Sequence, residues 1–455
     1  MRSVKGPAEI PILGSILELR HDPPAFFTRI AHEFGEVARF TVFGREALLF
    51  SDPELIKEVL VGQPKNFRKS RGLQLAKALL GEGLLTSEGE LHRRQRRLAA
   101  PAFAKTRLAK YGDDMVTIAL QHVDRFPHDE SVDVNQLMMR LTLAIVNKTL
   151  FNADVTGDEH KVADALEIIL NNMDRLLNPF TELMNMLPLP STLRLKQATE
   201  TLNSIVYRII ADRRANPGDR GDLLSIYMNA QDTPGDDENP DAKAPYRMSD
   251  KQIRDECLTL FIAGHETTAN ALSWTLYLLA QNPEWISRAQ QEIRTVTAGS
   301  NLQAEHFAQL NTLYRIFAEA LRLYPPAWTI SREAVVDTMI ADVAVKAGTT
   351  VVMASRWLGN AQWVMHRNPR LWKDPLAFDP DRFLPAAEEA RPRFAYFPFG
   401  GGPRQPLAGQ RPVYRRPVCL DGRRTRACGS AAKIFTRADR CGVQGRNSSY
   451  DHAET

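Results

Sequence analysis

The chain has 455 residues, of which 44% are hydrophobic and 25% are charged, and its net charge is +4. Such a chain folds as one large domain or as two or three smaller ones, and its composition excludes a disordered protein. No stretch of about 18 apolar residues is free of charge, and residues 1–19 are too weakly apolar for a signal peptide. We therefore expect a cytoplasmic protein without a membrane anchor.

The charge is distributed unevenly along the chain. Nine Arg and one Lys against four acids give the last 51 residues a charge of +6, so residues 1–404 carry −2 of the total of +4. Cys419, Cys428 and Cys441 also lie in this basic tail, and only Cys257 lies outside it. This distribution of cysteines is not that of a secreted protein stabilised by disulfides. We also expect no nucleic-acid partner.

Apolar residues recur at three- and four-residue spacing from residue 23 to about residue 324, which predicts a mainly helical chain. A short β-rich run interrupts it at 37–50, and the stretch 232–246 is rich in Pro, Asp, Gly and Asn, which indicates an exposed loop. The clearest helical patterns cover 25–34, 53–61, 111–126, 137–151 and 200–214.

One long helix is predicted from Ser249, which forms a capping box with Gln252, to the Asn-Pro pair at 282–283. Its middle is apolar on all sides, which indicates burial, yet it contains the sequence AGHETT at 263–268. Burying a carboxylate and two hydroxyls costs several kcal/mol unless they are satisfied or line a cavity. Two interpretations stay open: hydroxyls bonded back to helix carbonyls beside a structurally paired Glu266, or a functional site.

Three further signals follow in the last third of the chain. A helix at 312–323 places Glu319 and Arg322 on one face, a pair that contributes little if it is exposed. The segment 378–383 adds Arg382 in an aromatic, Pro-containing loop. The glycine-rich loop 397–404 lets the backbone approach a flat or anionic group, although it lacks the lysine of a P-loop.

In this order and spacing, the sequence resembles the cytochrome P-450 family of haem-thiolate monooxygenases over residues 1–404. The resemblance rests on AGHETT, Glu319-x-x-Arg322, the 378–383 segment and Phe399-x-x-Gly402-x-Arg404, with a weaker match at His92-x-x-x-Arg96 that by itself would indicate a solvated basic helix. It implies a mainly α fold, a helical triangular prism with a small β-rich part, as one domain spanning 1–404.

The resemblance also implies roles for individual residues. Thr267 would hold dioxygen and water, Glu266 would supply protons, and Gly264 would leave room for the ligand. Glu319, Arg322 and Arg382 would form a buried structural network. The residues expected to bind the haem cofactor, mainly through its propionates, are His92, Arg96, Arg332, Arg404 and Phe399.

The activity implied by the resemblance is that of a soluble, bacterial-type monooxygenase that inserts one oxygen atom from O2 into a lipophilic substrate such as a fatty acid or a terpenoid. A chain of 455 residues leaves no room for a flavin or nicotinamide domain. Electrons are therefore expected from a separate ferredoxin or flavodoxin and its reductase.

The sequence departs from the family where the iron ligand should be. The family cysteine would stand at Pro406, which has no donor atom, so we predict no metal ligand there. Read from the second codon base, residues 412–422 permit the translation Gln-Cys-Ile-Gly-Gly-Pro-Phe-Ala-Trp-Met-Glu, the family's continuation. We interpret 405–455 as a frame-shifted, disordered tail, and 354–361 as a second anomaly, an insertion.

Two alternatives to an active monooxygenase stay open. The chain is then either a non-catalytic relic or truncated-function product that binds haem weakly or not at all, or an all-helical regulatory protein that resembles the family by chance. A stably folded, haem-free purified protein would favour the second.

Overall fold

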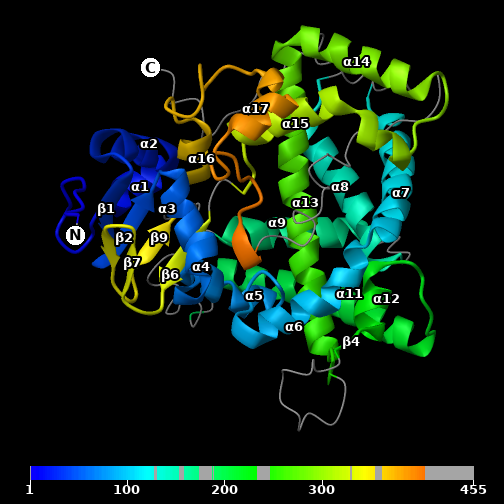
Figure 1. The fold of residues 1–455 in the computed structure, drawn as a ribbon. Helices are drawn as coiled ribbons and strands as arrows, with labels where there is room; N and C mark the ends of the chain where they lie inside the picture. Colours follow the sequence, from blue (N-terminus) through cyan, green and yellow to red (C-terminus); the bar gives the residue numbers. More distant parts are fainter. Residues whose placement is uncertain are drawn as a thin grey trace.

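The structure of the chain, a computed structural model, describes residues 2–127, 131–152, 158–173, 187, 189–232, 246–327, 330–353 and 361–404. It has a large helical part and a smaller β-rich part next to the N-terminus (Figure 1). The mainly α prediction agrees with this arrangement. The tail 405–455, most of the predicted loop 232–246 and residues 354–360 of the predicted insertion lie outside the described residues.

The predicted helices are present and most extend a few residues beyond the apolar pattern. The helices of the described ranges are α1 (Ile16–His21), α2 (Pro23–Phe34), α3 (Pro53–Lys57), α4 (Arg71–Leu75), α5 (Lys77–Leu80), α6 (Gly89–Ala99), α7 (Lys105–Val123), α8 (Val134–Phe151), α9 (Glu159–Met173), α11 (Pro190–Ala215), α12 (Leu223–Asn229), α13 (Asp250–Gln281), α14 (Pro283–Thr297), α15 (Asn311–Leu323), α16 (Ala361–His366) and α17 (Pro385–Ala390).

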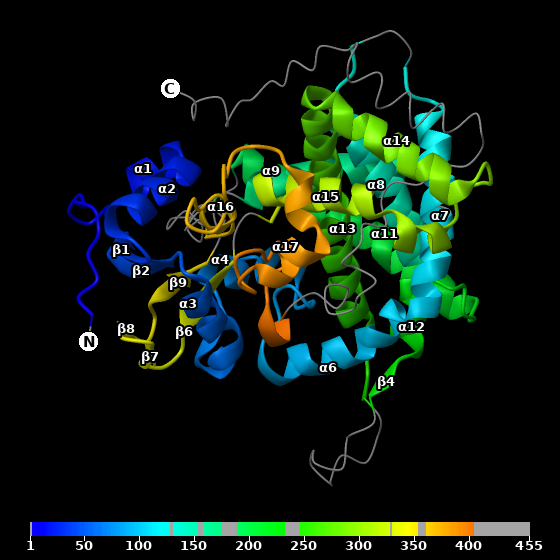
Figure 2. The same ribbon diagram turned by 45° about the horizontal axis from the view of Figure 1, so that its top comes forward.

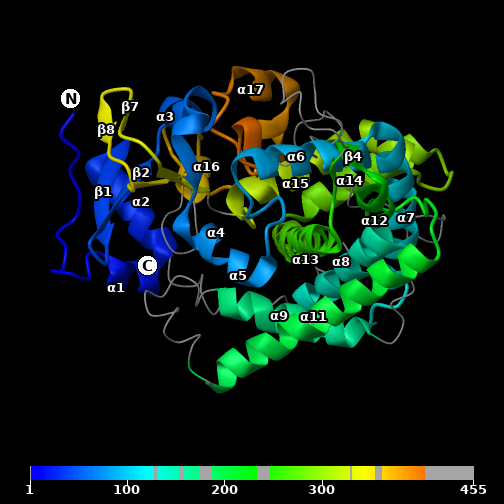
Figure 3. The same cartoon turned by 90° about the horizontal axis from the view of Figure 1, so that it is seen from below.

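Helix α13 is the axis of the helical part (Figures 1 and 2). It spans 32 residues, and the predicted capping box is formed, with the Ser249 side chain accepting from the Gln252 N–H. Figure 3 looks along α13 and shows α9 and α11 on one side of it, with α6 and α15 on the other. Neighbours on several sides explain why α13 is apolar around most of its circumference.

The β-rich part is a five-stranded sheet in the order β1-β2-β9-β6-β3, with the small β7-β8 hairpin beside it, whereas the two-stranded β4-β5 sheet lies apart, near α6 (Figure 1). β2 pairs in parallel with β9, whereas the other neighbours are antiparallel. The pairing of β3 with β6 places Lys69 directly opposite Arg332. The strands are β1 (Val37–Val42), β2 (Arg45–Phe50), β3 (Phe67–Lys69), β4 (Gln231–Asp232), β5 (Tyr246–Arg247), β6 (Ser331–Ala334), β7 (Thr338–Ile340), β8 (Val343–Val345) and β9 (Thr350–Val352).

Two large apolar clusters form the core, one in each part. The first surrounds the N-terminal half of α13 with side chains from α8, α9, α11 and α12, and it includes Phe151 of α8, Tyr227 of α12 and Phe261 of α13 itself. The second packs α2 against the sheet, where Phe27 and Phe40 meet edge to face. Each part therefore has its own apolar core, and the two parts meet at a junction with polar side chains.

A buried ion-pair network fixes the segment after α16 against α15. Arg322 donates from Nε and Nη2 to the two carboxylate oxygens of Glu319, at 2.6 and 2.7 Å, and both side chains are fully buried. The Arg382 guanidinium lies 3.4 Å from Glu319 Oε1. The structure thus brings together the three residues for which the sequence predicted a structural network.

The rest of the Arg322 guanidinium is satisfied by backbone carbonyls. Nη1 donates to the carbonyls of His366 and Pro375, at 2.6 and 2.7 Å, and Nη2 also donates to Ala377 at 3.1 Å. A buried ion pair stabilises a fold only when such additional hydrogen bonds compensate for the lost hydration. Here they join α15 to three carbonyls of the segment 366–377.

Replacing Glu319 with Ala strands the Arg322 charge in the interior. We expect Glu319→Ala to lower the free energy of unfolding by about 3–5 kcal/mol, measured by denaturant titration. The control is Glu54→Ala, which removes the exposed Lys57–Glu54 pair, whose side chains are 47% and 71% exposed, and should cost less than about 1 kcal/mol. Equal effects of the two substitutions would show that the network is not stabilising.

Candidate cofactor and oxygen site

The polar turn of α13 has one open face. Ala263 is exposed, although the residues just before it on α13 are buried. Thr267 follows one turn later on the same face, and its hydroxyl donates a hydrogen bond to the Ala263 carbonyl. Glu266 and Thr267 are both partly buried. Back-bonding of the hydroxyl, one of the two sequence interpretations, is therefore compatible with a hydroxyl that borders open space.

The opposite side of the same turn is occupied by α8. A Cβ atom at Gly264 would lie 3.0 Å from Val146 Cγ2, which is tighter than an ordinary contact. His265 is buried, its Nε2 lies 3.1 Å from the Met139 carbonyl oxygen, and burial lowers its pKa. Gly264 therefore has a packing role between α13 and α8, and the exposed residue of this turn is Ala263.

A second group of polar side chains lies where the sheet meets α6 and the glycine-rich loop. It comprises four cations and one histidine, which we call the cationic cluster: Lys69 of β3, His92 and Arg96 of α6, Arg332 of β6 and Arg404 of the short helical turn η7 (Gly402–Arg404). The structure thus brings together the four polar cofactor residues predicted from the sequence.

The charges within the cationic cluster repel one another. Burial, followed by repulsion from the surrounding cations, lowers the pKa of His92 to about 3, so its imidazole is neutral. Burial also lowers the pKa of Lys69 to about 7 and that of Arg332 to about 10, and Arg404 contributes to both shifts. Like charges placed directly opposite on paired strands are destabilising, as Lys69 and Arg332 are here.

One carboxylate partly compensates for this charge. Glu88 accepts hydrogen bonds from Arg404 Nη2 and from the backbone N–H of Lys69, both at 2.6 Å. Arg96 Nη2 is buried without a hydrogen-bond partner among the described residues. Buried cationic donors in excess of acceptors indicate a site for an anion that carries more than one negative charge.

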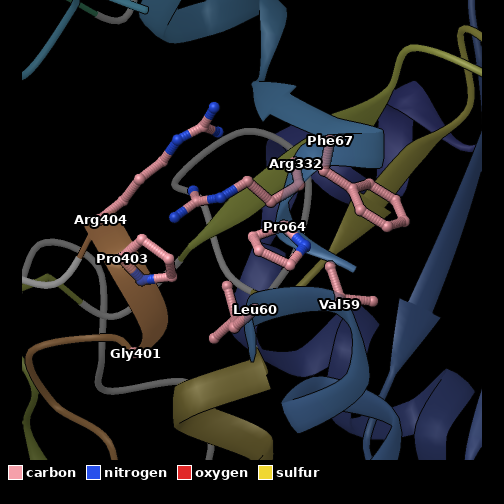
Figure 4. A pocket seen from close by; sticks show the side chains of 8 residues that line it. All are labelled: Val59, Leu60, Pro64, Phe67, Arg332, Gly401, Pro403 and Arg404. Carbon is pink, nitrogen blue, oxygen red and sulfur yellow. The ribbon is translucent and has the colours of Figure 1, made fainter. Parts of the chain in front are cut away.

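The glycine-rich loop lies beside the cationic cluster. Gly400 and Gly402 have φ angles of +71° and +72°, and a Cβ atom at Gly402 would lie 1.9 Å from the Leu60 carbonyl oxygen, so both positions require glycine. The Phe399 side chain is 46% exposed. Figure 4 shows Arg332 and Arg404 reaching toward the same cleft, which is lined by Val59, Leu60, Pro64, Phe67, Gly401 and Pro403.

Comparison with known proteins identifies the family. The family model of cytochrome P-450 matches residues 4–407. The chain belongs to the cytochrome P-450 family. It is therefore related to haem-dependent monooxygenases that act on lipophilic substrates with O2 and redox partners, and its cofactor is haem iron. The match ends at residue 407, within the loop that carries the departure from the family pattern.

Curated relatives in Streptomyces are similar over most of the chain. Cyclooctatin synthase of Streptomyces melanosporofaciens is 34% identical over 409 residues, which cover 89% of this chain and 85% of the relative. Cyclooctat-9-en-7-ol 5-monooxygenase of the same organism is 30% identical, with 87% and 83% covered. Pentalenene oxygenase of Streptomyces avermitilis is 29% identical, with 88% and 85% covered.

The fold is shared with a solved cytochrome P-450. The crystal structure of a cytochrome P-450 haem domain superposes with a TM-score of 0.77 at 25% identity, covering 95% of this chain and 90% of that chain. The mainly α fold with a small β-rich part, predicted from the sequence, is thereby confirmed. Within the part of the chain that the structure describes, no helix is long and apolar enough to cross a membrane.

The residues of the cationic cluster fit the haem of this family. Haem carries two propionate carboxylates, and the cluster offers buried cationic donors in excess together with an unpartnered Arg96 Nη2. Lys69 is the member that the sequence analysis missed. Lys69 lies in a short strand that matches none of the family motifs, and only its register opposite Arg332 identifies it as part of the cluster.

The iron ligand is the part of the site that the cluster does not supply. The described residues contain no group of His, Cys, Asp or Glu side chains that could hold a metal ion. The family's ligand position, Pro406, lies outside the described residues, and proline has no donor atom.

The lowered pKa of Lys69 predicts a specific pH dependence. The folded apoprotein releases this proton near pH 7, whereas the unfolded chain keeps it up to about pH 10.5. The unfolded state therefore binds more protons between these values, and Lys69 makes stability rise with pH by at most about 1.4 kcal/mol per unit. Conversely, this stabilising contribution of Lys69 declines as the pH falls from about 10.5, and it is lost once the pH has fallen through about 7.

The measurement compares the native chain with Lys69→Met by denaturant titration between pH 7 and 10. The other ionisations are common to both proteins, so they cancel in the difference. We expect the native stability to rise relative to that of Lys69→Met. Parallel profiles would show that Lys69 titrates as an ordinary exposed lysine.

Proposed function

We propose that this chain derives from a bacterial monooxygenase of cyclic terpenoids, in which the cationic cluster holds the haem propionates and the Ala263–Thr267 face of α13 manages dioxygen and protons. The observation that carries this proposal is the excess of buried cations with an unpartnered Arg96 Nη2. The alternative of an unrelated regulatory protein does not account for that excess.

Each residue has a task that follows from its position. Lys69, Arg96, Arg332 and Arg404 neutralise the two carboxylates, and neutral His92 donates a hydrogen bond. Phe399, exposed on the glycine-rich loop, would pack against the haem. The haem, when bound, supplies the iron at which dioxygen is activated.

On α13, Thr267 and Glu266 handle water and protons. Because the Thr267 hydroxyl donates its proton to the Ala263 carbonyl, its oxygen remains available as an acceptor for a water molecule in the open space. Glu266, the residue that precedes Thr267 on α13, passes protons to that water as a general acid. The small Ala263 side chain keeps the exposed face of this part of the helix close to the ligand.

The names of the relatives support the substrate class. They specify an unsaturated hydrocarbon, pentalenene, and an unsaturated alcohol, cyclooctat-9-en-7-ol. We therefore favour a cyclic terpenoid over a fatty acid. The electron donor is a ferredoxin or flavodoxin in the cytoplasm, and an acidic donor suits the basic α6, on which Arg93 and Arg97 are exposed.

A second function, that of a non-catalytic relic, is favoured by Pro406 and by the end of the family match at residue 407. On this proposal the monooxygenase domain is 1–404, and 405–455 is a frame-shifted product. The nucleotide sequence around 404–422 tests it directly. A Gln-Cys-Ile-Gly continuation in another frame supports the shift, and its absence overturns it.

We expect the chain as it stands to give no red-shifted Soret band of the thiolate type in the reduced carbon monoxide difference spectrum. The reason is that Pro406 has no donor atom for the iron. The control is a frame-restored variant in which the cysteine follows Arg404 at family spacing, and this variant should show the band. A thiolate-type band from the native chain would contradict the assignment of the tail.

The role of Thr267 is tested in the frame-restored variant. Thr267→Ala removes the hydroxyl that holds water beside Ala263, so reducing equivalents should be diverted to hydrogen peroxide while haem content is unchanged. The measurement is the ratio of product to reductant consumed. The control, Thr275→Ala, removes a buried hydroxyl that bonds to the Ala271 carbonyl two turns further along α13. An unchanged ratio in Thr267→Ala would refute the assignment.

A further inference from the structure

The segment 81–87, between α5 and α6, is held tightly against α13. The backbone N–H of Glu82 donates to Asp255 Oδ2 at 2.9 Å, and that of Leu84 donates to Glu256 Oε2 at 3.1 Å. A Cβ atom at Gly83 would lie 2.2 Å from Thr259 Oγ1, so only glycine permits this approach. Two adjacent carboxyl groups of α13 thus bind the backbone of one short segment.

The same segment is held from its other side by the cationic cluster. Lys69 Nζ donates to the carbonyls of Leu84 and Ser87, at 2.8 and 2.7 Å. Leu84 is therefore bound through its N–H by α13 and through its carbonyl by β3. Gln95 of α6 donates to the Glu82 carbonyl at 2.6 Å, so α6, which carries His92 and Arg96, is tied to the segment as well.

Burying the carboxyl group of Glu256 in this position costs free energy, which suggests that the residue has a structural or functional role. It is fully buried, and Oε1 has no hydrogen-bond partner among the described residues. The titratable groups that face it are Lys69 from β3, Tyr227 from α12, and Asp255 and Cys257 of its own helix. Burial, with a smaller contribution from Asp255, raises the pKa of Glu256 to about 8.

We propose that Glu256 is a positioning residue for the cationic cluster: from α13 it holds the segment 81–87, and through that segment it sets the positions of Lys69 and of α6. The inference rests on the proposed function only for the identity of the dianion that the cluster binds. It links the helix that carries Thr267 to the residues that bind the cofactor carboxylates.

Hydrogen exchange of the full-length apoprotein tests the contact. Glu256→Ala leaves the Leu84 N–H without its acceptor, so the amides of 82–87 and of the first turn of α6 should exchange at least tenfold faster at pH 7. Glu256→Gln retains an acceptor and should restore the native rates. The control, Thr275→Ala, should leave the segment unchanged. Native rates in Glu256→Ala, or equal acceleration in Thr275→Ala, would overturn the proposal.

The pH profile separates positioning from general destabilisation. The pKa of Glu256 in the folded protein, about 8, lies above that of an exposed glutamate, so Glu256 takes up a proton when the segment 81–87 docks. The stability that this proton provides is lost as the pH rises through about 8. Relative to Glu256→Gln, which retains the titration of Lys69, the protection factors of 82–87 in the native chain should therefore fall between pH 7 and 9. Identical profiles would overturn the proposal, and this comparison holds even where Glu256→Ala does not fold.

Binding of haemin and of haemin dimethyl ester connects the contact to the cluster. Glu256→Ala should weaken haemin binding about tenfold, measured by absorbance titration, and leave binding of the ester, which lacks both carboxylates, unchanged. Equal weakening for both ligands would overturn the positioning role. If the native chain does not prefer haemin to the ester, the proposed haem site fails, while the exchange and pH comparisons still decide the role of Glu256.

Discussion

Repulsion among buried cations is the constraint around which the junction of the two parts is built. Lys69 and Arg332 face each other across β3 and β6, Arg404 approaches from the glycine-rich loop, and His92 is kept neutral by burial and by the charges around it. Glu88 offsets only part of this charge. We propose that an anion completes the arrangement, namely the propionates of the haem that this family binds.

The same junction explains why the surrounding backbone is so restricted. Gly402 lets the loop pass beside Leu60, and Gly83 lets the segment 81–87 reach α13. The Glu319–Arg322 pair fixes the segment 366–377 by hydrogen bonds to its carbonyls. Charged side chains thus bind backbone groups throughout this region, so the folding of the β-rich part and the formation of the site are physically coupled.

In the proposed site, this junction recognises the carboxylates of haem, whereas the iron ligand depends on a different stretch of sequence. Pro406 lies at the family's ligand position, and the family match ends one residue later. Recognition of the cofactor and activation of dioxygen are therefore separable properties here. In the proposed site, the first depends on residues spread over β3, α6, β6 and η7, and the second also requires an iron ligand that proline cannot replace.

The sequence by itself determined the helices, the capping box of α13 and the order of the family motifs, because these depend on local periodicity and spacing. It also indicated Glu319 with Arg322, which are neighbours on one helix face. Only the tertiary structure decided that Lys69 joins the cluster, that Gly264 packs against Val146 and that Glu256 reaches Leu84. Each of these contacts joins residues that are far apart in the chain, so no local sequence pattern predicts them.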